Sequence, residues 1–471
     1  MINIGGTKSA PVLGNGLELR FASPIICWEI AGVCGNNGTG KKINELVSIS
    51  VQEKNRGTEK LSKAIEEEIE EDEVNPPIKR EKKKGQFQIG KNSTSSGLSS
   101  EIKGIRFDPV VLEPDYLNLI SHGHHDHLPK RLNMPAVSSS ITWEVGRLRA
   151  GALKKEFLPI LVKESTPIKL CGKSSSDGKE VEISIRAYDS GHTLGSTMFL
   201  IEDSSNMIVD GRVLFAGEVN FRKRHYTEGA KPVKCETLIT EVIYPGIDFR
   251  LPDERKELSS LIEWLEINMK SGKIPAVHIY PFGKAQFIQL VFSDADMPFI
   301  ISSQIEQINE AVCRAIEIYP EASFVNSRDF LKKTLKNNCK THDIMEDIPD
   351  RNIPVNSPIP YRQSDIGINP HIYIASAFDH KDVLGKLGPA AVLTGHAAVK
   401  GYIHKIWHSR MVKGFAISDH CDNNSLAQFV ERCSPQKLFT INKSGDNLAK
   451  RVSTQTEHLN LKKGQYTLEG W

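Results

Sequence analysis

The chain has 471 residues, of which 39% are hydrophobic and 25% are charged, close to the composition of an average soluble globular protein. This length is enough for two or three domains, and it excludes a small scaffold held together by disulfides. Because 60 Lys and Arg residues stand against 58 Asp and Glu residues, any binding of a polyanion must depend on local basic patches.

Targeting and redox features are sparse. The sequence has no run of about 18 apolar residues, so it predicts no transmembrane helix. Met1–Leu13 lacks the basic start and apolar run of a signal peptide. The eight cysteines have no C-x-x-C spacing, which argues against a disulfide framework or a cysteine-based zinc finger. We therefore expect a reducing, cytoplasmic compartment and no membrane association.

The segment of residues 33–105 differs in composition from the rest. An acidic block at Glu66–Glu73, a basic block at Lys79–Lys84 and a Ser-rich stretch at Asn92–Ser100 contain few apolar residues. Such a segment buries too little surface to offset its ordering entropy. We expect a largely disordered, charged insertion, with a charged helix near Ser62–Glu71.

A glycine-rich string within this segment, Gly35–Lys42, fits the pattern G-x-x-x-x-G-K. A nucleotide-binding P-loop requires Ser or Thr next, as a Mg²⁺ ligand, and this chain has Lys42. We interpret the string as a loop.

From Ile105 onward, short apolar runs alternate with helical patterns. The helical spacing of Leu258, Leu261 and Leu265 predicts a helix that ends near Gly272, and a further helix is expected from Lys284. Ser303 and Glu306 have capping-box spacing ahead of another helix. This alternation predicts an α+β protein whose second part is an α/β layer domain. The expected strands are Tyr116–Ile120, Thr197–Ile201, Val213–Ala216, Thr237–Thr240, Ala276–Tyr280 and Gly414–Ile417.

The strongest chemical signal is the string S-H-G-H-H-D-H at residues 121–127. It follows a predicted strand, where alternation directs His122 and His124 to the same side. Imidazole and carboxylate groups suit zinc and similar divalent ions. The string therefore predicts a metal site, and Asp126 and His127 on the following turn allow a second metal beside the first.

This H-x-H-x-D-H string resembles that of the metallo-β-lactamase superfamily. Other segments resemble the family's motifs in the same order: Asp108 before the string, D-S-G-H-T-L-G-S at 189–196, A-G-E at 216–218, T-E-V-I-Y at 240–244 and S-D-H-C-D at 418–422. The last two resemble motifs of the β-CASP nuclease branch. P-F-G-K-A-Q at 281–286 resembles a turn of the ligase-associated DNA exonucleases, relatives of the RNA 3′-end processing nucleases and of DNA-repair nucleases.

The resemblance implies a metallo-β-lactamase αββα sandwich with an inserted β-CASP-like cap. Residues 1–32 and 106–245 would form the first part of the metallo-β-lactamase domain, interrupted by the 33–105 insertion. Residues 246–395 would form the cap, and residues 396–471 the return segment.

The resemblance also implies two zinc ions, with manganese as another possible ion. His122, His124 and His192 would hold the first metal, Asp126 and His127 the second, and Glu218 would bridge the two. A metal-activated hydroxide would attack phosphorus, and His420, or Glu241 acting through it, would protonate the leaving oxygen.

Two departures from the family pattern affect the second metal. Glu218 replaces an aspartate, and Asn442 stands where the family has its last histidine. We therefore expect the second metal to bind more weakly.

Two basic features have two interpretations each. Lys284 begins a predicted helix after a turn, which favours either a substrate-binding contact to phosphate or a solvated side chain. The basic string Arg222–His225 either follows a phosphate backbone or forms a solvated loop.

The hypothesis that these motifs favour is a hydrolase of the exonuclease type, acting on DNA or RNA in DNA repair or RNA processing, with repair or processing proteins as partners. The first alternative is a degenerate relative that binds nucleic acid without cutting it. The second is a small-molecule hydrolase of the same fold, against which the long cap argues.

Overall fold

The computed structural model describes residues 20–21, 87–89, 104–112, 116–132, 134, 136–150, 160–173, 180–203, 211–244, 246, 248–336, 339–340, 372–376, 389–403, 412–441, 445–452 and 457–461. Most of the 33–105 segment, with its expected helix and its glycine-rich loop, lies outside the described residues, and so does Asn442.

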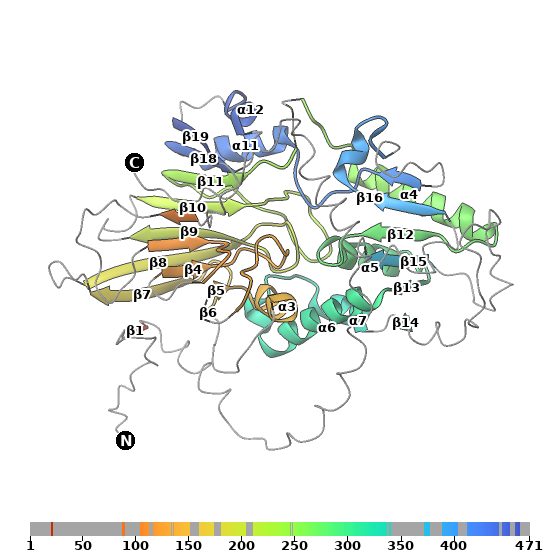
Figure 1. Cartoon of the computed structure of the whole chain (residues 1–471), viewed down its shortest axis with the longest axis horizontal. Helices are drawn as coiled ribbons and strands as arrows, with labels where there is room; N and C mark the ends of the chain where they lie inside the picture. The colour runs from red at the N-terminus through yellow and green to blue at the C-terminus, as the bar shows by residue number, and fades with distance from the viewer. Residues whose placement is uncertain are drawn as a thin grey trace, which may run out of the picture.

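An eight-stranded sheet forms the larger part of the first structural unit (Figure 1). Its first five strands pair antiparallel and its last four pair parallel, with β10 common to both sets. In order across the sheet they are β1 (Arg20–Phe21), β7 (Pro167–Lys173), β8 (Glu180–Asp189), β9 (Thr197–Asp203), β10 (Arg212–Gly217), β11 (Thr237–Glu241), β18 (Lys437–Ile441) and β19 (Glu457–Leu461).

A five-stranded sheet packs against one face of the eight-stranded sheet. The rings of Phe107 and Phe215, one from each sheet, stack 4.2 Å apart in the shared core. Alternation along β10 sends Val213 and Phe215 into this core and Leu214 to the opposite face. The smaller sheet comprises β2 (Phe87–Ile89), β3 (Gly104–Phe107), β4 (Tyr116–Leu119), β5 (Val137–Ser138) and β6 (Ile160–Leu161).

Helices cover both outer faces of these paired sheets. Helix α11 (Asn423–Cys433) packs Leu426 and Val430 on the outer face of the eight-stranded sheet, next to α12 (Gly445–Ala449). On the side of the five-stranded sheet, α3 (Ser140–Ala150) contributes Trp143 to a small core with Ile120. The unit therefore has four layers, helix, sheet, sheet and helix, in agreement with the expected α+β class.

The second unit is a six-stranded sheet in which all strands are parallel (Figure 1). The expected domain boundary at residue 395 falls inside this sheet, because its last strand, β17, pairs with β16 after that point. The strands, in spatial order, are β14 (Cys339–Lys340), β13 (Phe299–Ile301), β15 (Ile372–Ser376), β12 (Ala276–Ile279), β16 (Ala390–Leu393) and β17 (Val412–Phe415).

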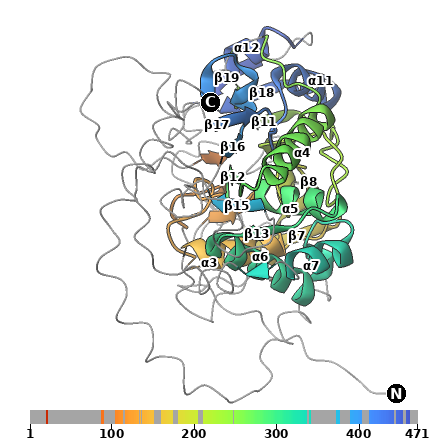
Figure 2. The ribbon, with the colours of Figure 1, turned by 90° about the vertical axis from the view of Figure 1, so that its right-hand side faces the viewer.

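Four helices pack with this sheet, and Figure 2 shows them with the second unit facing the viewer. They are α4 (Glu254–Lys270), α5 (Lys284–Asp294), α6 (Ser303–Ile318) and α7 (Arg328–Lys336), with short 3-10 turns at Pro320–Ala322 and Gly395–Ala398. Asp253 caps α4 by accepting hydrogen bonds from the amides of Arg255 and Lys256, and Gly272 follows its end with φ of 72°.

One detail of the expected helix starts is wrong. Ser302, not Ser303, is the N-cap of α6, and its side chain makes no capping hydrogen bond. The Ser303–Glu306 spacing therefore does not form a capping box, since Ser303 is already helical.

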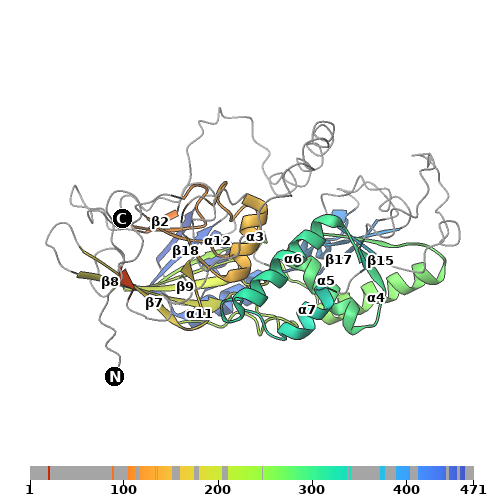
Figure 3. The same cartoon turned by 90° about the horizontal axis from the view of Figure 1, so that it is seen from below.

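Helix α3 joins the two units, and Figure 3 shows it beside α6. Ile141 and Val145 of α3 belong to the hydrophobic core of the second unit. The buried carboxylate of Glu144 accepts hydrogen bonds from Arg147 at 2.8 Å and from Arg314 of α6 at 2.9 Å. The loops that carry the histidine motifs lie at this junction. Among the helices within the described residues, none is long and apolar enough to cross a membrane.

Candidate metal centre

The H-x-H-x-D-H string follows β4 and is fixed by Asp108, which follows β3. Asp108 accepts hydrogen bonds from the amide and the hydroxyl of Ser121, both at 2.7 Å, and from His127 Nδ1 at 2.9 Å. Because the Ser121 hydroxyl donates to Asp108, it accepts from His122 Nδ1 at 2.9 Å. The remaining nitrogen of His122, Nε2, therefore carries a free lone pair.

His192 lies on a tight turn after β8 and is completely buried. Gly191 in this turn has φ of 68°, and a Cβ there would lie 2.2 Å from the carbonyl oxygen of Asn220. Asp189 fixes the turn by accepting a hydrogen bond from the Gly191 amide at 2.7 Å, and its second carboxylate oxygen accepts from Thr227. Only glycine fits this position, which explains the D-S-G-H order.

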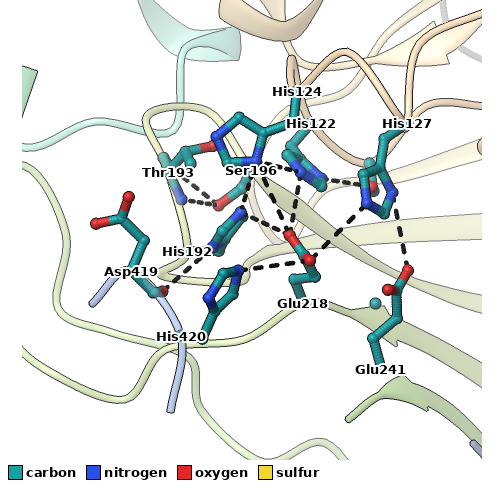
Figure 4. A network of polar contacts seen from close by, with 12 residues as sticks. His122, His124, His127, His192, Thr193, Ser196, Glu218, Glu241, Asp419 and His420 are labelled. Carbon is teal, nitrogen blue, oxygen red and sulfur yellow. Dashed lines mark hydrogen bonds and ion pairs between the residues drawn. The ribbon is translucent and has the colours of Figure 1, made fainter. Parts of the chain in front are cut away.

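Three imidazole nitrogens converge at the centre of the site (Figure 4). His122 Nε2 lies 3.0 Å from His124 Nδ1, and His192 Nε2 lies 3.1 Å from the same atom. The opposite nitrogens of His124 and His192 each lie 3.2 Å from a backbone carbonyl, that of Phe282 and that of Asp419 respectively. Because a carbonyl oxygen only accepts, these outer nitrogens carry hydrogens, and the neutral form of each ring presents a lone pair on its inner nitrogen.

Glu218, directly after β10, places its carboxylate among these rings (Figure 4). Its side chain is 7% exposed. Its nearest imidazole nitrogens are those of His192 at 2.7 Å, His122 at 3.3 Å, His420 at 3.4 Å, His127 at 3.9 Å and His124 at 4.0 Å. Burial alone would raise the pKa of Glu218, but the surrounding histidines, His192 first, hold it well below its ordinary value.

The chemistry of this donor set fits a divalent metal. His122, His124, His192 and Glu218 each offer one ligand atom, and all four atoms lie within 4.8 Å of one another. Three lone pairs and a carboxylate that face one another repel unless a positive charge lies between them, and N and O donors of this kind suit zinc. Burial lowers the pKa of His124 to about 3, so this ring stays neutral, as a metal ligand must. We name these four residues the first cluster.

A second cluster shares Glu218 with the first and adds His127 and Glu241, which ends β11. Glu241 lies 3.8 Å from His127 Nδ1, and Asp126 lies 3.5 Å from His127 Nε2. Burial would lower the pKa of His127, but Asp126, Glu241 and Asp108 raise it well above its ordinary value. The side chain of Asp126 is 53% exposed, so this predicted ligand lies at the rim of the site.

His420 lies beside both clusters. Its ring stacks on His192 with centroids 4.7 Å apart, and its amide donates to Ser418 Oγ at 2.9 Å. Burial lowers the pKa of His420, and the Glu218 carboxylate opposes this shift. The structure thus brings together eight of the nine predicted site residues, all except Lys284: His122, His124, Asp126, His127, His192, Glu218, Glu241 and His420.

The side chain of Lys284, the predicted phosphate contact, is instead buried. Its side chain donates to the carbonyl of Leu393 at 3.1 Å and lies over the ring of Tyr280. Burial lowers the pKa of Lys284, and the nearby carboxylate of Asp419 opposes the shift. The ammonium group therefore interacts with a buried carboxylate, that of Asp419, in this structure.

Within the basic string Arg222–His225, Lys223 is exposed and pairs with Glu228 at 2.8 Å, whereas Arg224 is buried. Its guanidinium donates to Asp419 at 2.7 Å, to the carbonyl of Ser418 at 2.6 Å and to Glu254 of α4 at 2.5 Å. It also lies 4.0 Å from the ring centre of Phe287. Arg224 thus ties the 418–420 turn, which anchors His192, to the second unit.

Sequence reasoning gave the string containing Arg224 another role, and it did not identify Arg149, whose guanidinium donates to the carbonyl of Gly123 at 2.8 Å between two cluster histidines. The only local signal for Arg149 is a helix, α3, that begins two residues after β5, and it does not distinguish this residue from Arg147.

Comparison with known proteins gives distant relatives, and no protein-family model matches the chain. This chain is 24% identical over 274 residues to cleavage and polyadenylation specificity factor 73 of Drosophila melanogaster. The match covers 57% of this chain and 34% of the relative. This chain is 30% identical over 218 residues to endoribonuclease ysh-1 of Neurospora crassa, and the match covers 40% of this chain and 24% of the relative. A probable DNA ligase of Opitutus terrae is 19% identical to this chain over 332 residues, and the match covers 70% of this chain and 27% of the relative.

The chain thus spans between about a quarter and a third of the length of these curated relatives. Together with the four-layer fold and the histidine clusters, these similarities support the metallo-β-lactamase superfamily, and its β-CASP branch, as the class to which this chain is related.

Proposed function

We propose that this chain is a metal-dependent phosphodiesterase that hydrolyses the backbone of DNA or RNA, as an exonuclease of the ligase-associated type. The observation that carries the proposal is the first cluster, where three imidazoles with fixed outer hydrogens direct lone pairs at one point beside Glu218. The relatives named as an endoribonuclease, a cleavage factor and a DNA ligase support nucleic acid as the substrate.

In this proposal, His122, His124, His192 and Glu218 hold a first zinc ion, and His127, Asp126 and Glu241 hold a second, weaker one with Glu218. The chemistry that a divalent metal supplies when bound is activation of water and stabilisation of negative charge on a phosphoryl group. We assign the metal ligands to residues 106–245, and the residues from about 246 to the end of β17 to an inserted cap.

The chain's own groups then handle protons and orientation. The Glu218 carboxylate, 3.4 Å from His420 Nε2, favours the protonated form of this ring, and a proton that His420 takes up passes to the leaving oxygen. The carbonyls of Phe282 and Asp419 keep His124 and His192 in the required tautomers. Both carbonyls follow strands of the second unit, so closure of this unit over the site also orients the ligands.

The test is metal analysis of the purified protein, followed by digestion of labelled single-stranded and double-stranded oligonucleotides in Zn²⁺ or Mn²⁺. Substrates labelled at the 5′ end or at the 3′ end distinguish exonuclease from endonuclease action and give the polarity. We expect metal-dependent shortening from one end, abolished by a chelator and restored by metal.

Two results would replace the proposal. Tight binding of oligonucleotides with bound zinc and no cleavage would favour a degenerate, non-catalytic relative. Bound zinc without either binding or cleavage of nucleic acid would favour a small-molecule hydrolase.

A further inference from the structure

Arg149 lies in the last turn of α3, against the loop that carries the first two histidines. Its guanidinium donates to the carbonyl of Gly123 at 2.8 Å, between His122 and His124. A Cβ on Gly123 would lie 2.9 Å from both Val145 and Phe282, so α3 and the cap turn enclose this loop tightly. The position of Arg149 relative to the first cluster is therefore well defined.

Among the described residues, no carboxylate forms an ion pair with Arg149. Asp126 acts on its guanidinium only at longer range. Arg147, two residues earlier, is paired with Glu144 at 2.8 Å, and Arg224 is paired with two carboxylates. Arg149 therefore differs from both of these arginines.

Arg149 also remains a cation at neutral pH and is partly open to solvent. Burial lowers the pKa of its guanidinium to about 10, which still leaves it charged at pH 7. The residue is half-buried. Its guanidinium lies 5.7 Å from the ring centre of Phe282, and that ring meets His124 edge-on at 5.8 Å. The cation is thus held one aromatic ring away from a ligand of the first cluster.

We infer that Arg149 binds a backbone phosphate of the substrate strand, adjacent to the phosphodiester that is cut. A guanidinium has five N–H donors in a planar fork, and the bond to Gly123 uses one side of it, which leaves donors for phosphate oxygens. Phosphate supplies the negative charge that Arg149 lacks. This inference rests on the proposed function, and it gives Arg149 the role that the sequence assigned to Lys284.

The experiment measures binding of a fluorescent 12-nucleotide single strand, as DNA and as RNA, to metal-free wild type, Arg149→Gln and Arg147→Gln. Arg147→Gln is the matched control, because it removes an arginine of the same helical turn that already has a carboxylate partner. We expect Arg149→Gln to raise Kd about tenfold, or ~1.4 kcal/mol, and to reduce the slope of log Kd against log salt by about 0.7, the value for one phosphate contact on a single strand. Arg147→Gln should bind like wild type.

A second arm keeps the test decisive if Arg149→Gln fails to fold. A set of oligonucleotides, each with one neutral methylphosphonate, is titrated against wild type and Arg149→Lys. Wild type should lose affinity at one position of the set, and Arg149→Lys, which lacks the fork, should lose less there.

The inference and the proposed function fail in distinguishable ways. If wild type binds and cuts the strand but Arg149→Gln and Arg147→Gln bind equally well, Arg149 is not a phosphate ligand and the nuclease proposal stands. If no methylphosphonate position discriminates wild type from Arg149→Lys, the inference is likewise overturned. If wild type neither binds nor cuts any strand, the proposed function is wrong and the inference falls with it.

Discussion

The first and second clusters meet at Glu218 but differ in how their ligands are held. In the first cluster, His122 and His192 are at most 1% exposed, and an outer oxygen fixes the tautomer of each ring. The second cluster has one imidazole, His127, and the side chain of Asp126, the other predicted ligand of the second metal, is half-exposed. Ordering a solvated carboxylate costs entropy that a buried, hydrogen-bonded imidazole has already lost on folding. We therefore expect the first cluster to bind zinc more tightly.

The comparison also shows that the better-held cluster depends on distant parts of the chain. The outer hydrogen of His124 goes to the carbonyl of Phe282 in the turn before α5, and that of His192 goes to the carbonyl of Asp419 after β17. The outer hydrogen of His127 goes to Asp108, within the first unit. Disturbing the junction between the units should therefore weaken the first cluster and spare the second.

The largest effect is expected from replacing His122 and His124 together by alanine. Zinc titration of wild type should resolve a tight and a weak site, and the double variant should lose the tight one, with at least about a hundredfold loss of affinity, because one imidazole and one carboxylate cannot complete a catalytic zinc site. Circular dichroism checks that the fold persists. Two sites of equal affinity in wild type, or stoichiometric zinc in the double variant, would contradict the expected difference in affinity between the two clusters.

The next largest effect is expected for Arg224→Gln. Its removal leaves the carboxylates of Asp419 and Glu254 buried without their partner, which should lower the free energy of unfolding by about 3–5 kcal/mol. Because Asp419 anchors His192, the tight zinc site should weaken about tenfold while the weak site is unchanged.

Arg222→Gln is the control for this variant. Arg222 lies in the same loop but is 26% exposed and 3.8 Å from Glu254, so its loss should cost less than about 1 kcal/mol. An Arg224→Gln protein that is destabilised but retains full zinc affinity would show that the anchor is not transmitted to His192.

A smaller, pH-dependent effect is expected at Asp189, in the turn that carries His192. Burial raises the pKa of Asp189 from 3.8 to about 7 in the folded protein. Between about pH 4 and 7 the folded protein therefore holds a proton that the unfolded chain has lost, so this group lowers the stability as the pH rises, by about 1 kcal/mol per pH unit.

Asp189→Asn removes this titration and retains an oxygen for the Gly191 amide. Denaturant unfolding at pH 5 and at pH 7 should show the variant gaining stability relative to wild type at the higher pH. A stability difference that is the same at both pH values would contradict the assignment.

The smallest effect concerns Glu218, which both clusters share. Its carboxylate lies 2.7 Å from His192 Nε2, and an aspartate would withdraw it by roughly 1.5 Å, one carbon–carbon bond, leaving more room among the nitrogens. We expect Glu218→Asp to retain metal and to raise turnover at least about tenfold, which corresponds to ~1.4 kcal/mol of barrier. Wild-type zinc content and cleavage in both Glu218→Asp and Glu218→Ala would remove Glu218 from the site.

Much of this architecture could be predicted from local patterns. The apolar runs ahead of residues 121 and 218 form the expected strands β4 and β10, and the helical spacing around Leu261 forms α4. Motif order, together with strand ends, indicated eight imidazole or carboxylate groups that the fold brings close together.

The charged side chains could not be predicted in this way. Arg224 lies in a basic string and Lys284 at a turn before a helix, and both are buried because Asp419, which lies well over a hundred residues away in the sequence, is close to them in space. Burial of a cation depends on the position of its counter-charge, and a single sequence carries no local signal for it. The same applies to Arg149 and Arg147, whose difference arises only from Glu144 on one face of α3.

The pairing of β18 between β11 and β19 has a consequence for how the protein is made. Glu241 at the end of β11 pairs with Ile441 of β18, so the edge of β11 stays open while the ribosome adds about 200 residues. At the usual rate of translation this takes roughly 10–40 s. During that time the nascent chain exposes an unpaired parallel strand, which is prone to aggregation, and it also lacks the Asp419 carbonyl that orients His192. We therefore expect newly made chains to need a holding chaperone, and to acquire zinc only after release.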